Sequence, residues 1–250
     1  MHSIINPKYL HLRDFLLSLP YRFETLQCDA VLHTGRNEVR LYTVAGVRLV
    51  VKSFARISWL NRVAYGLLRP SKAVRAYQYA QRLLAMGIDT PVPVAVIDVR
   101  EGGVLRHSFF VSLYSEYESL DVLNHYPGQP LEPLLDMLTD YILKVHDCGV
   151  LHGDLNASNI LYRKVDEEYY LFQLIDINRL SFKRNLSHNE RLSNLRKLNC
   201  NPVAYFYILG RYAQVLNERE EAFQLRGMSM RLMDDMRHRA KMRLKQKIKH

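Results

Sequence analysis

The sequence predicts an α+β fold with two differently built halves. Up to residue 113, β-branched and aromatic residues recur at alternating positions, which is typical of strands, and one stretch is strongly helical. After residue 120, apolar residues recur at helical spacing instead. We therefore expect a mostly antiparallel sheet with one major helix over 1–113, a hinge over 114–120 and a mostly helical part over 121–250. A length of 250 residues suits one domain of two lobes or two small domains.

The N-terminal elements follow from local patterns. Residues 1–20 predict a weak helix that ends at Pro20, and a second helix is expected over 57–69. Serine is a preferred N-cap residue, and Ser71 stands directly before the major helix. Gly87 is expected to end that helix. Alternating apolar residues predict four strands, at 39–44, 47–54, 94–99 and 105–113.

The C-terminal half begins with a helix whose apolar residues continue to Val145 and which Gly149 stops. A strand over 169–177 follows and carries Asp176 near its end. From residue 190 onward the pattern is helical and amphipathic, with a break at Pro202.

Charge is concentrated near the C-terminus. The formal net charge is +10, and residues 231–250 carry eight Lys or Arg against two Asp, so +6 of it lies in this segment. The three cysteines are far apart and lack metal-ligand spacing, which favours a reducing compartment. No signal peptide and no apolar run of about 18 residues is visible. We expect a cytoplasmic protein.

One stretch indicates chemistry. In His152-Gly153-Asp154, the aspartate precedes Asn159 by five residues, and a second carboxylate follows at Asp176. Phosphoryl transfer needs a carboxylate that orients the attacking hydroxyl, oxygen ligands for Mg²⁺ and a cation on the donor phosphates. Lys52, at the end of an apolar strand, supplies the cation. The order of Lys52, Asp154, Asn159 and Asp176 along the chain is the one expected for phosphoryl transfer.

These motifs resemble the protein-kinase-like superfamily over residues 30–215. The variant with Gly153 in place of arginine is typical of kinases of small molecules and of lipopolysaccharide. By this resemblance, Asp154 is the catalytic carboxylate, Asn159 and Asp176 hold Mg²⁺, and Lys52 contacts the phosphates of ATP. The resemblance also places the phosphate-covering loop at Gly35, Arg36 and Asn37, and backbone groups at Glu116 and Tyr117 against the adenine.

A finer resemblance points to the bacterial lipopolysaccharide core (Kdo/heptose) kinases. The segment Asp176-Ile177-Asn178-Arg179 is similar to that family's Asp-x-Asn-Arg, and residues 76–91 and 194–198 are similar to it as well. The resemblance implies ATP- and Mg²⁺-dependent phosphorylation of a sugar hydroxyl on the lipopolysaccharide core or on a lipid-linked acceptor.

One departure concerns the major helix. Kinases place a glutamate there to pair with the strand lysine, but residues 71–86 contain no acidic residue. Gln78 stands at the expected position, and its amide cannot neutralise Lys52. The enzyme would then tolerate the change, recruit another carboxylate or be weakly active.

Each motif also has a simpler interpretation. Asp154 and Asn159 could cap a helix and a turn, and Lys52 alone could be a surface charge. His146 and Cys148 are expected to be packed residues, because neither has a visible metal or base partner in the sequence.

The basic segment 231–250 leaves three alternatives open. It is a solvated helix end, a helix that binds an anionic membrane surface, or a nucleic-acid contact. The membrane alternative would place the protein peripherally at the inner membrane. Nucleic acid is disfavoured because aromatic residues are not interleaved with the basic ones.

Two other functions compete with the lipopolysaccharide kinase. A RIO-like atypical kinase or ATPase of ribosome maturation uses a similar Asp…Asn loop, although its phosphate-loop sequence is absent here. A pseudokinase that binds nucleotide without transfer is the other, and the missing helix glutamate motivates it.

Overall fold

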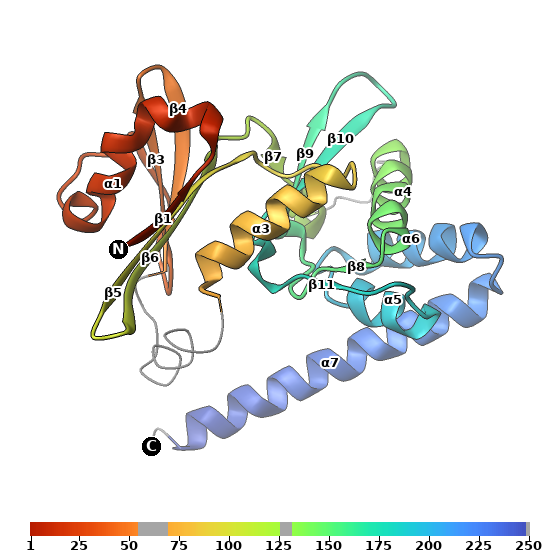
Figure 1. The fold of residues 1–250 in the computed structure, drawn as a ribbon. Coiled ribbons are helices and arrows are strands. Elements are labelled where there is room, and N and C mark those ends of the chain that lie inside the picture. Colours follow the sequence, from red (N-terminus) through yellow and green to blue (C-terminus); the bar gives the residue numbers. More distant parts are fainter. Residues whose placement is uncertain (55–69, 126–131, 249–250) are drawn as a thin grey trace. The chain divides into compact units, whose positions relative to one another are not determined.

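The computed structural model describes residues 1–54, 70–125 and 132–248, so the helix expected over 57–69 lies outside the described residues. The chain divides into two compact units. The first comprises Met1–Glu116 and Asp176–Arg179, and the second comprises Tyr117–Ile175 and Leu180–His250. Figure 1 shows the elements of both in sequence colours.

The first unit is built on a six-stranded antiparallel sheet with the order β1-β5-β6-β4-β3-β2. Its strands are β1 (His2–Ile5), β2 (Ala30–His33), β3 (Glu38–Val44), β4 (Val47–Ser53), β5 (Pro93–Glu101) and β6 (Val104–Leu113). The four predicted strands are thus present, and β1 and β2 add an edge strand on each side.

Side-chain alternation along the strands assigns one helix to each face of this sheet. Ala95 and Ile97 pack into the cluster that includes α1 (Arg13–Arg22), whereas Val96 between them packs with α3 (Lys72–Ala85). Figure 1 shows the two helices on either side of the strands. The same alternation puts Val51 on the α1 face and therefore Lys52 on the α3 face.

Helix α3 forms where the sequence predicts it. The Ser71 hydroxyl accepts a hydrogen bond from the Val74 amide, which is the N-cap arrangement. Gly87 follows the helix with a φ of +68°, a conformation that glycine adopts at little cost. The buried side chains of the helix lie at helical spacing and are Ala73, Ala76, Tyr77, Ala80 and Leu83.

The prediction for residues 1–20 is wrong in two respects. Residues 2–5 form the edge strand β1, which is too short to show a period, and Pro20 lies inside α1 rather than at its end. An internal proline costs about 3 kcal/mol, but Leu16 and Leu19 are fully buried against the sheet. Packing of these side chains outweighs the local cost, so the helix continues to Arg22.

The second unit is mostly helical. A three-stranded sheet has the order β10-β9-β7, and a two-stranded one pairs β11 with β8. The strands are β7 (Glu118–Ser119), β8 (Val150–Leu151), β9 (Ile160–Lys164), β10 (Tyr170–Leu174) and β11 (Ser181–Phe182). The α-helices that the structure describes in this unit are α4 (Glu132–Asp147), α5 (His188–Leu195), α6 (Pro202–Val215) and α7 (Glu220–Ile248). Pro202 begins α6, as its missing amide hydrogen allows.

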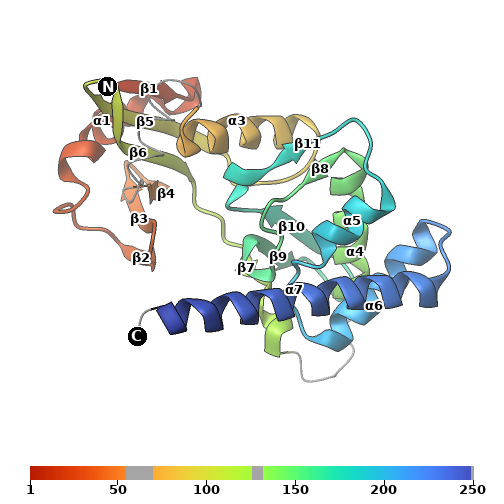
Figure 2. The same ribbon diagram turned by 90° about the horizontal axis from the view of Figure 1, so that it is seen from below.

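Among the described side chains of helix α7, those that anchor it lie in its first half. Arg231 donates to the carbonyl of Cys200 (2.6 Å) and lies over the Tyr205 ring, and Asp234 pairs with Arg196. From residue 235 to residue 244, every side chain is exposed. Figure 2 shows this end of the helix extending beyond α5 and α6. No helix of the described residues is long and apolar enough to span a bilayer.

Gly149 connects α4 to β8 and is confirmed as the end of the helix. Its φ is +74°, and its carbonyl accepts a hydrogen bond from the Lys183 amide (2.8 Å). A Cβ at this position would lie 1.9 Å from the Lys183 carbonyl oxygen, which is a backbone atom. Both the backbone conformation and the contact therefore require glycine.

We expect Gly149→Ala to lower the free energy of unfolding by about 3 kcal/mol, because strain and a backbone clash combine. Gly46→Ala is the matched control, since Gly46 has a φ of +78° and a Cβ added there would meet nothing within 4 Å. It should cost about 1 kcal/mol from strain alone. Urea unfolding of both variants measures the difference, and equal losses would contradict a role for the backbone clash.

Candidate functional site

The loop between β8 and β9 holds the predicted catalytic carboxylate, and its own side chains shape it. The side-chain carbonyl oxygen of Asn156 accepts from the Asn159 amide (3.1 Å), which caps a short 3₁₀ turn over Ala157–Asn159. The Asn159 side-chain amide donates to the Asp154 main-chain carbonyl (2.9 Å). Asp154 and Asn159, five residues apart, are thereby held in one compact turn.

His152 links this loop to the end of β10. Its ring is fully buried, with Nδ1 accepting from the Asp154 amide (3.1 Å) and Nε2 donating to the Ile175 carbonyl (2.9 Å). The β9–β10 pairing adds a bond from the Ile175 amide to the Asn159 carbonyl (3.0 Å). These bonds join the Asp154 loop to the end of β10, and Ile175 directly precedes Asp176 in the chain.

Side chains of the segment that ends α5 hold the main chain of the loop. Asn194 accepts from the His152 amide (3.2 Å) and donates to the His152 carbonyl (2.7 Å). The Lys197 ammonium donates to the Gly153 carbonyl (2.6 Å), and Asn199 accepts from the Ala157 amide (2.8 Å). Three side chains thus fix main-chain groups on both sides of Asp154.

A buried histidine forms a hydrogen bond with the side chain of Asn194. His146 on α4 has Nδ1 2.7 Å from the Tyr212 hydroxyl of α6 and Nε2 3.1 Å from the Asn194 side-chain oxygen. Asn194 can only accept there, so Nε2 carries the proton and Nδ1 accepts from Tyr212. Burial lowers the pKa of His146 to about 4, so the ring is neutral at physiological pH.

The second group of predicted residues lies in the first unit. The Lys52 ammonium pairs with Oδ1 of Asp176 (2.5 Å), and the side-chain amide of Asn178 donates to the same oxygen (2.5 Å). Asp176 has a φ of +52°, in the left-handed region that is unfavourable for a residue with a side chain. The two bonds hold the carboxylate in a strained conformation of the kind that clusters at functional sites.

Further positive charge surrounds this pair. Lys72, the first residue of α3, lies 5.9 Å from the centroid of the Phe54 ring, and Lys52 lies 5.6 Å from the same centroid. Burial and the nearby guanidinium groups of Arg36, Arg179 and Arg75 lower the pKa of Lys72. Arg36 of the predicted phosphate-covering loop, between β2 and β3, therefore belongs to this group.

The other predicted contacts lie elsewhere. Gln78 is exposed on α3, and no hydrogen bond joins it to Lys52 among the described residues. The carboxylate that pairs with Lys52 is Asp176, which is itself a predicted metal ligand. Glu116 pairs with Arg48, and the guanidinium of Arg163 lies over the Tyr117 ring at 4.9 Å. Gly35 is exposed and Asn37 is half-buried in the β2–β3 loop.

The predicted metal ligands have suitable chemistry. Within the described ranges, no group of three or more His, Cys, Asp and Glu residues could hold a metal ion. Asn159 uses its side-chain nitrogen for Asp154, so its side-chain oxygen is directed away from that bond. An amide oxygen and the Asp176 carboxylate are ligands of the type that Mg²⁺ takes, together with water and phosphate. Each of the two residues therefore has a donor type that suits this ion.

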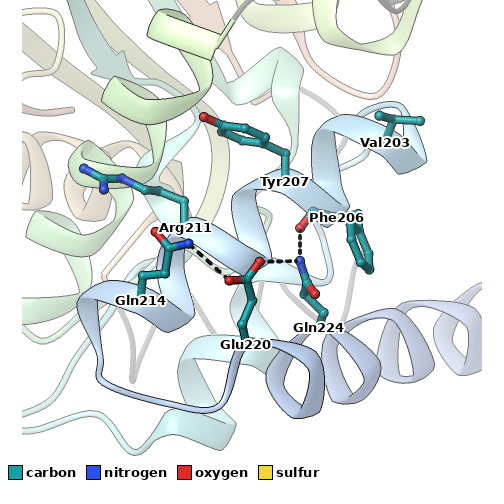
Figure 3. Close-up of a pocket in the computed structure, with 7 residues that line it drawn as sticks. All are labelled: Val203, Phe206, Tyr207, Arg211, Gln214, Glu220 and Gln224. Atoms are coloured by element: carbon teal, nitrogen blue, oxygen red, sulfur yellow. Dashed lines mark hydrogen bonds between the residues drawn. The ribbon is translucent and has the colours of Figure 1, made fainter.

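A pocket of about 290 Å³ lies between α6 and α7 (Figure 3). Three of its polar side chains are bonded to one another, with Glu220 accepting from Gln214 (3.1 Å) and from Gln224 (3.3 Å). Gln224 also donates to the Phe206 carbonyl (3.3 Å). These bonds join the two helices, and none of the predicted site residues lines this pocket. Its lining residues are Val203, Phe206, Tyr207, Arg211, Gln214, Glu220 and Gln224.

Comparison with known proteins assigns the family. The model of the lipopolysaccharide kinase (Kdo/WaaP) family matches residues 34–205, which is more than half of the chain and includes Lys52, Asp154, Asn159 and Asp176. The chain belongs to this family. It is therefore a kinase, and the family is not that of the RIO-like alternative.

Two further similarities agree with the assignment of this kinase. The structure of WaaP in complex with acyl carrier protein matches with a TM-score of 0.62 and 17% sequence identity, over 96% of this chain and 98% of that chain. At this identity the match shows the fold, and it confirms the predicted protein-kinase-like architecture. The serine/threonine-protein kinase pkn2 of Myxococcus xanthus is 36% identical over 86 residues. That match covers 33% of this chain and only 10% of the length of pkn2.

Several residues of the kinase were not singled out individually by sequence reasoning. Asn194 and Lys197 lie in a segment noticed only for its family likeness, and Asn178 in the similar Asp-x-Asn-Arg segment proves to hold Asp176. Lys72 gave one signal, namely a lysine in the first turn of a helix without acidic residues. The contacts of these side chains are formed by tertiary structure.

His146 should make the stability of the kinase depend on pH. Its folded pKa of about 4 lies below the unfolded value of 6.5, so the unfolded chain binds more protons between these values. The contribution of His146 to the free energy of unfolding is fully present above pH 6.5 and is lost as pH falls towards 4. At pH 5, about 2 kcal/mol of it has been lost relative to high pH. We expect His146→Gln to lack this part of the pH dependence in urea unfolding at pH 8, 6 and 5.

The control is His238→Gln, which changes an exposed histidine on α7. It should keep the wild-type pH dependence. A His146→Gln curve that parallels the wild type between pH 8 and 5 would show that the pKa of His146 does not differ between the folded and unfolded chain.

Proposed function

We propose that the kinase transfers the γ-phosphoryl group of ATP, with Mg²⁺, to a sugar hydroxyl of the lipopolysaccharide core, either Kdo or heptose. The observation that carries the proposal is the fixed main chain around Asp154, in a chain of the lipopolysaccharide kinase family. A carboxylate in a preorganised loop can orient an acceptor hydroxyl and accept its proton without reorganisation of the loop.

In this proposal, the remaining residues position the donor. Lys52 contacts the α- and β-phosphates, and the loop of Gly35, Arg36 and Asn37 covers them. Asn159 and Asp176 hold Mg²⁺, which supplies charge neutralisation at the donor phosphates when bound. The pair of Lys52 and Asp176 (2.5 Å) supports these roles, because the cation and the metal ligand are already side by side.

The proposal also assigns the two compact units to the two lobes of a kinase. The sheet of the first unit would provide the nucleotide-covering lobe and the helices of the second unit the catalytic lobe. The segment 114–120 would be the hinge, and the backbone at Glu116 and Tyr117 would meet the adenine. The division of the chain between Glu116 and Tyr117 supports this assignment.

The last part of α7 would bind an anionic membrane surface, at which a lipid-linked acceptor is presented. Basic side chains at Arg237 and Lys241 share one helical face, and Met236 and Leu244 are exposed apolar residues on the same stretch. This would place the kinase peripherally at the inner membrane, in the cytoplasm.

We expect Asp154→Asn to lower kcat for phosphotransfer to purified core oligosaccharide by at least about a hundredfold, because the hydroxyl loses its proton acceptor. The affinity for ATP should stay within about threefold, since Asp154 is not assigned to the nucleotide. Asp235→Asn, an exposed carboxylate on α7, is the matched control and should keep full activity. Full phosphotransfer by Asp154→Asn would refute the mechanism.

The membrane contact can be tested with vesicles. Each basic residue near an anionic surface contributes about 1 kcal/mol, so Arg237→Gln with Lys241→Gln should weaken binding to phosphatidylglycerol vesicles about thirtyfold. Lys8→Gln with Arg13→Gln removes the same charge from exposed positions in the first unit and should leave binding unchanged.

Equal binding of both double variants would contradict a specific contact of α7. WaaP was solved with acyl carrier protein, so a carrier protein is the other occupant to examine. Binding of purified acyl carrier protein through Arg237 and Lys241, without vesicle binding, would assign the helix to that partner instead.

A further inference from the structure

Two lysines share one aromatic ring on the α3 face of the sheet. The centroid of the Phe54 ring is 5.6 Å from the Lys52 ammonium and 5.9 Å from the Lys72 ammonium. Phe54 is buried, with an exposed fraction of 2%, and packs against Ala73 and Tyr77 of α3. The ring therefore fixes the first turn of α3 beside the end of β4, and both ammonium groups lie near this one ring.

Lys72 is poorly placed for the stability of its own helix. It is the first residue of α3, and the first turn contains no acidic residue. The N-terminal end of a helix carries partial positive charge, so a cation there is unfavourable. Burial, Arg36, Arg179 and Arg75 all act against the charge of Lys72, and the nearby carboxylate that favours it is Asp176. Oδ1 of Asp176 already accepts from Lys52 and Asn178.

We propose that Lys72 is a second phosphate-binding lysine, which together with Lys52 and Arg36 binds the oligophosphate of the nucleotide. This inference deepens the proposed function and rests on it. The helix that in other kinases supplies an acidic partner for the strand lysine would here supply a second cation to the phosphates.

Three cations on different elements favour a ligand with several linked anionic groups, such as an oligophosphate, over a single anion. Lys52 of β4 and Lys72 of α3 lie 5.6 and 5.9 Å from one ring centroid, and Arg36 of the β2–β3 loop is near enough to lower the pKa of Lys72. Several linked anionic groups can meet all three at once, and charge-assisted bonds to phosphate are the strong ones. A phosphate on the acceptor has the same chemistry, but the shared Phe54 ring and Asp176 carboxylate place Lys72 with the nucleotide lysine.

The test measures the affinities of adenosine, AMP, ADP, ATP and tripolyphosphate by titration calorimetry in EDTA, so that metal does not contribute. Lys72→Met should weaken ATP, ADP and tripolyphosphate about tenfold, AMP less, and adenosine not at all. Lys72→Arg should restore most of the affinity, because it keeps the charge. Lys8→Met, which removes an exposed lysine of the same unit, should leave all five unchanged.

The outcomes separate this inference from the proposed function. Wild-type binding of ATP that Lys72→Met leaves unchanged would overturn the role of Lys72 and leave the nucleotide dependence intact. Absence of ATP binding by the wild type, in EDTA and with Mg²⁺, would overturn the nucleotide dependence itself. Binding of a hexose phosphate, but not of tripolyphosphate, that depends on Lys72 would assign the lysine to the acceptor and overturn the nucleotide assignment.

Discussion

The geometry of the site depends on a chain of hydrogen bonds that begins at a neutral, buried histidine. His146 bonds Tyr212 on one side and Asn194 on the other, and Asn194 bonds both main-chain groups of His152. His152 in turn bonds the Asp154 amide and the Ile175 carbonyl. Loop residues without regular secondary structure are thereby joined by hydrogen bonds to α4, α5 and α6, and such support is what the precise positioning of a catalytic group requires.

Charge is arranged differently around Lys52 and Asp176. Lys52 pairs with Asp176, a carboxylate that lies 124 positions later in the chain and has a left-handed backbone conformation. Because α3 contributes lysine and arginine rather than glutamate, positive charge accumulates around that one carboxylate. The sequence shows that α3 lacks an acidic residue at the position of Gln78. The structure shows that Lys72 of the same helix has several arginines near it.

The sequence predicts those features that local chemistry determines. The Ser71 cap, the Gly149 helix end and the strands of the first half follow from short patterns, and the order of Lys52, Asp154, Asn159 and Asp176 predicts a kinase-like architecture. Residues whose role depends on distant partners escape such prediction. The exposed position of Gln78 and the continuation of α1 through Pro20 follow from packing, which no local pattern encodes.

In the proposed function, the kinase adds a phosphate to the lipopolysaccharide core. Mass spectrometry of lipopolysaccharide from cells with the gene, without it and with the Asp154→Asn form tests this directly. We expect deletion to remove the mass of one phosphate from the core, and the wild-type gene to restore it while Asp154→Asn does not. An unchanged core mass in the deletion strain would contradict this function.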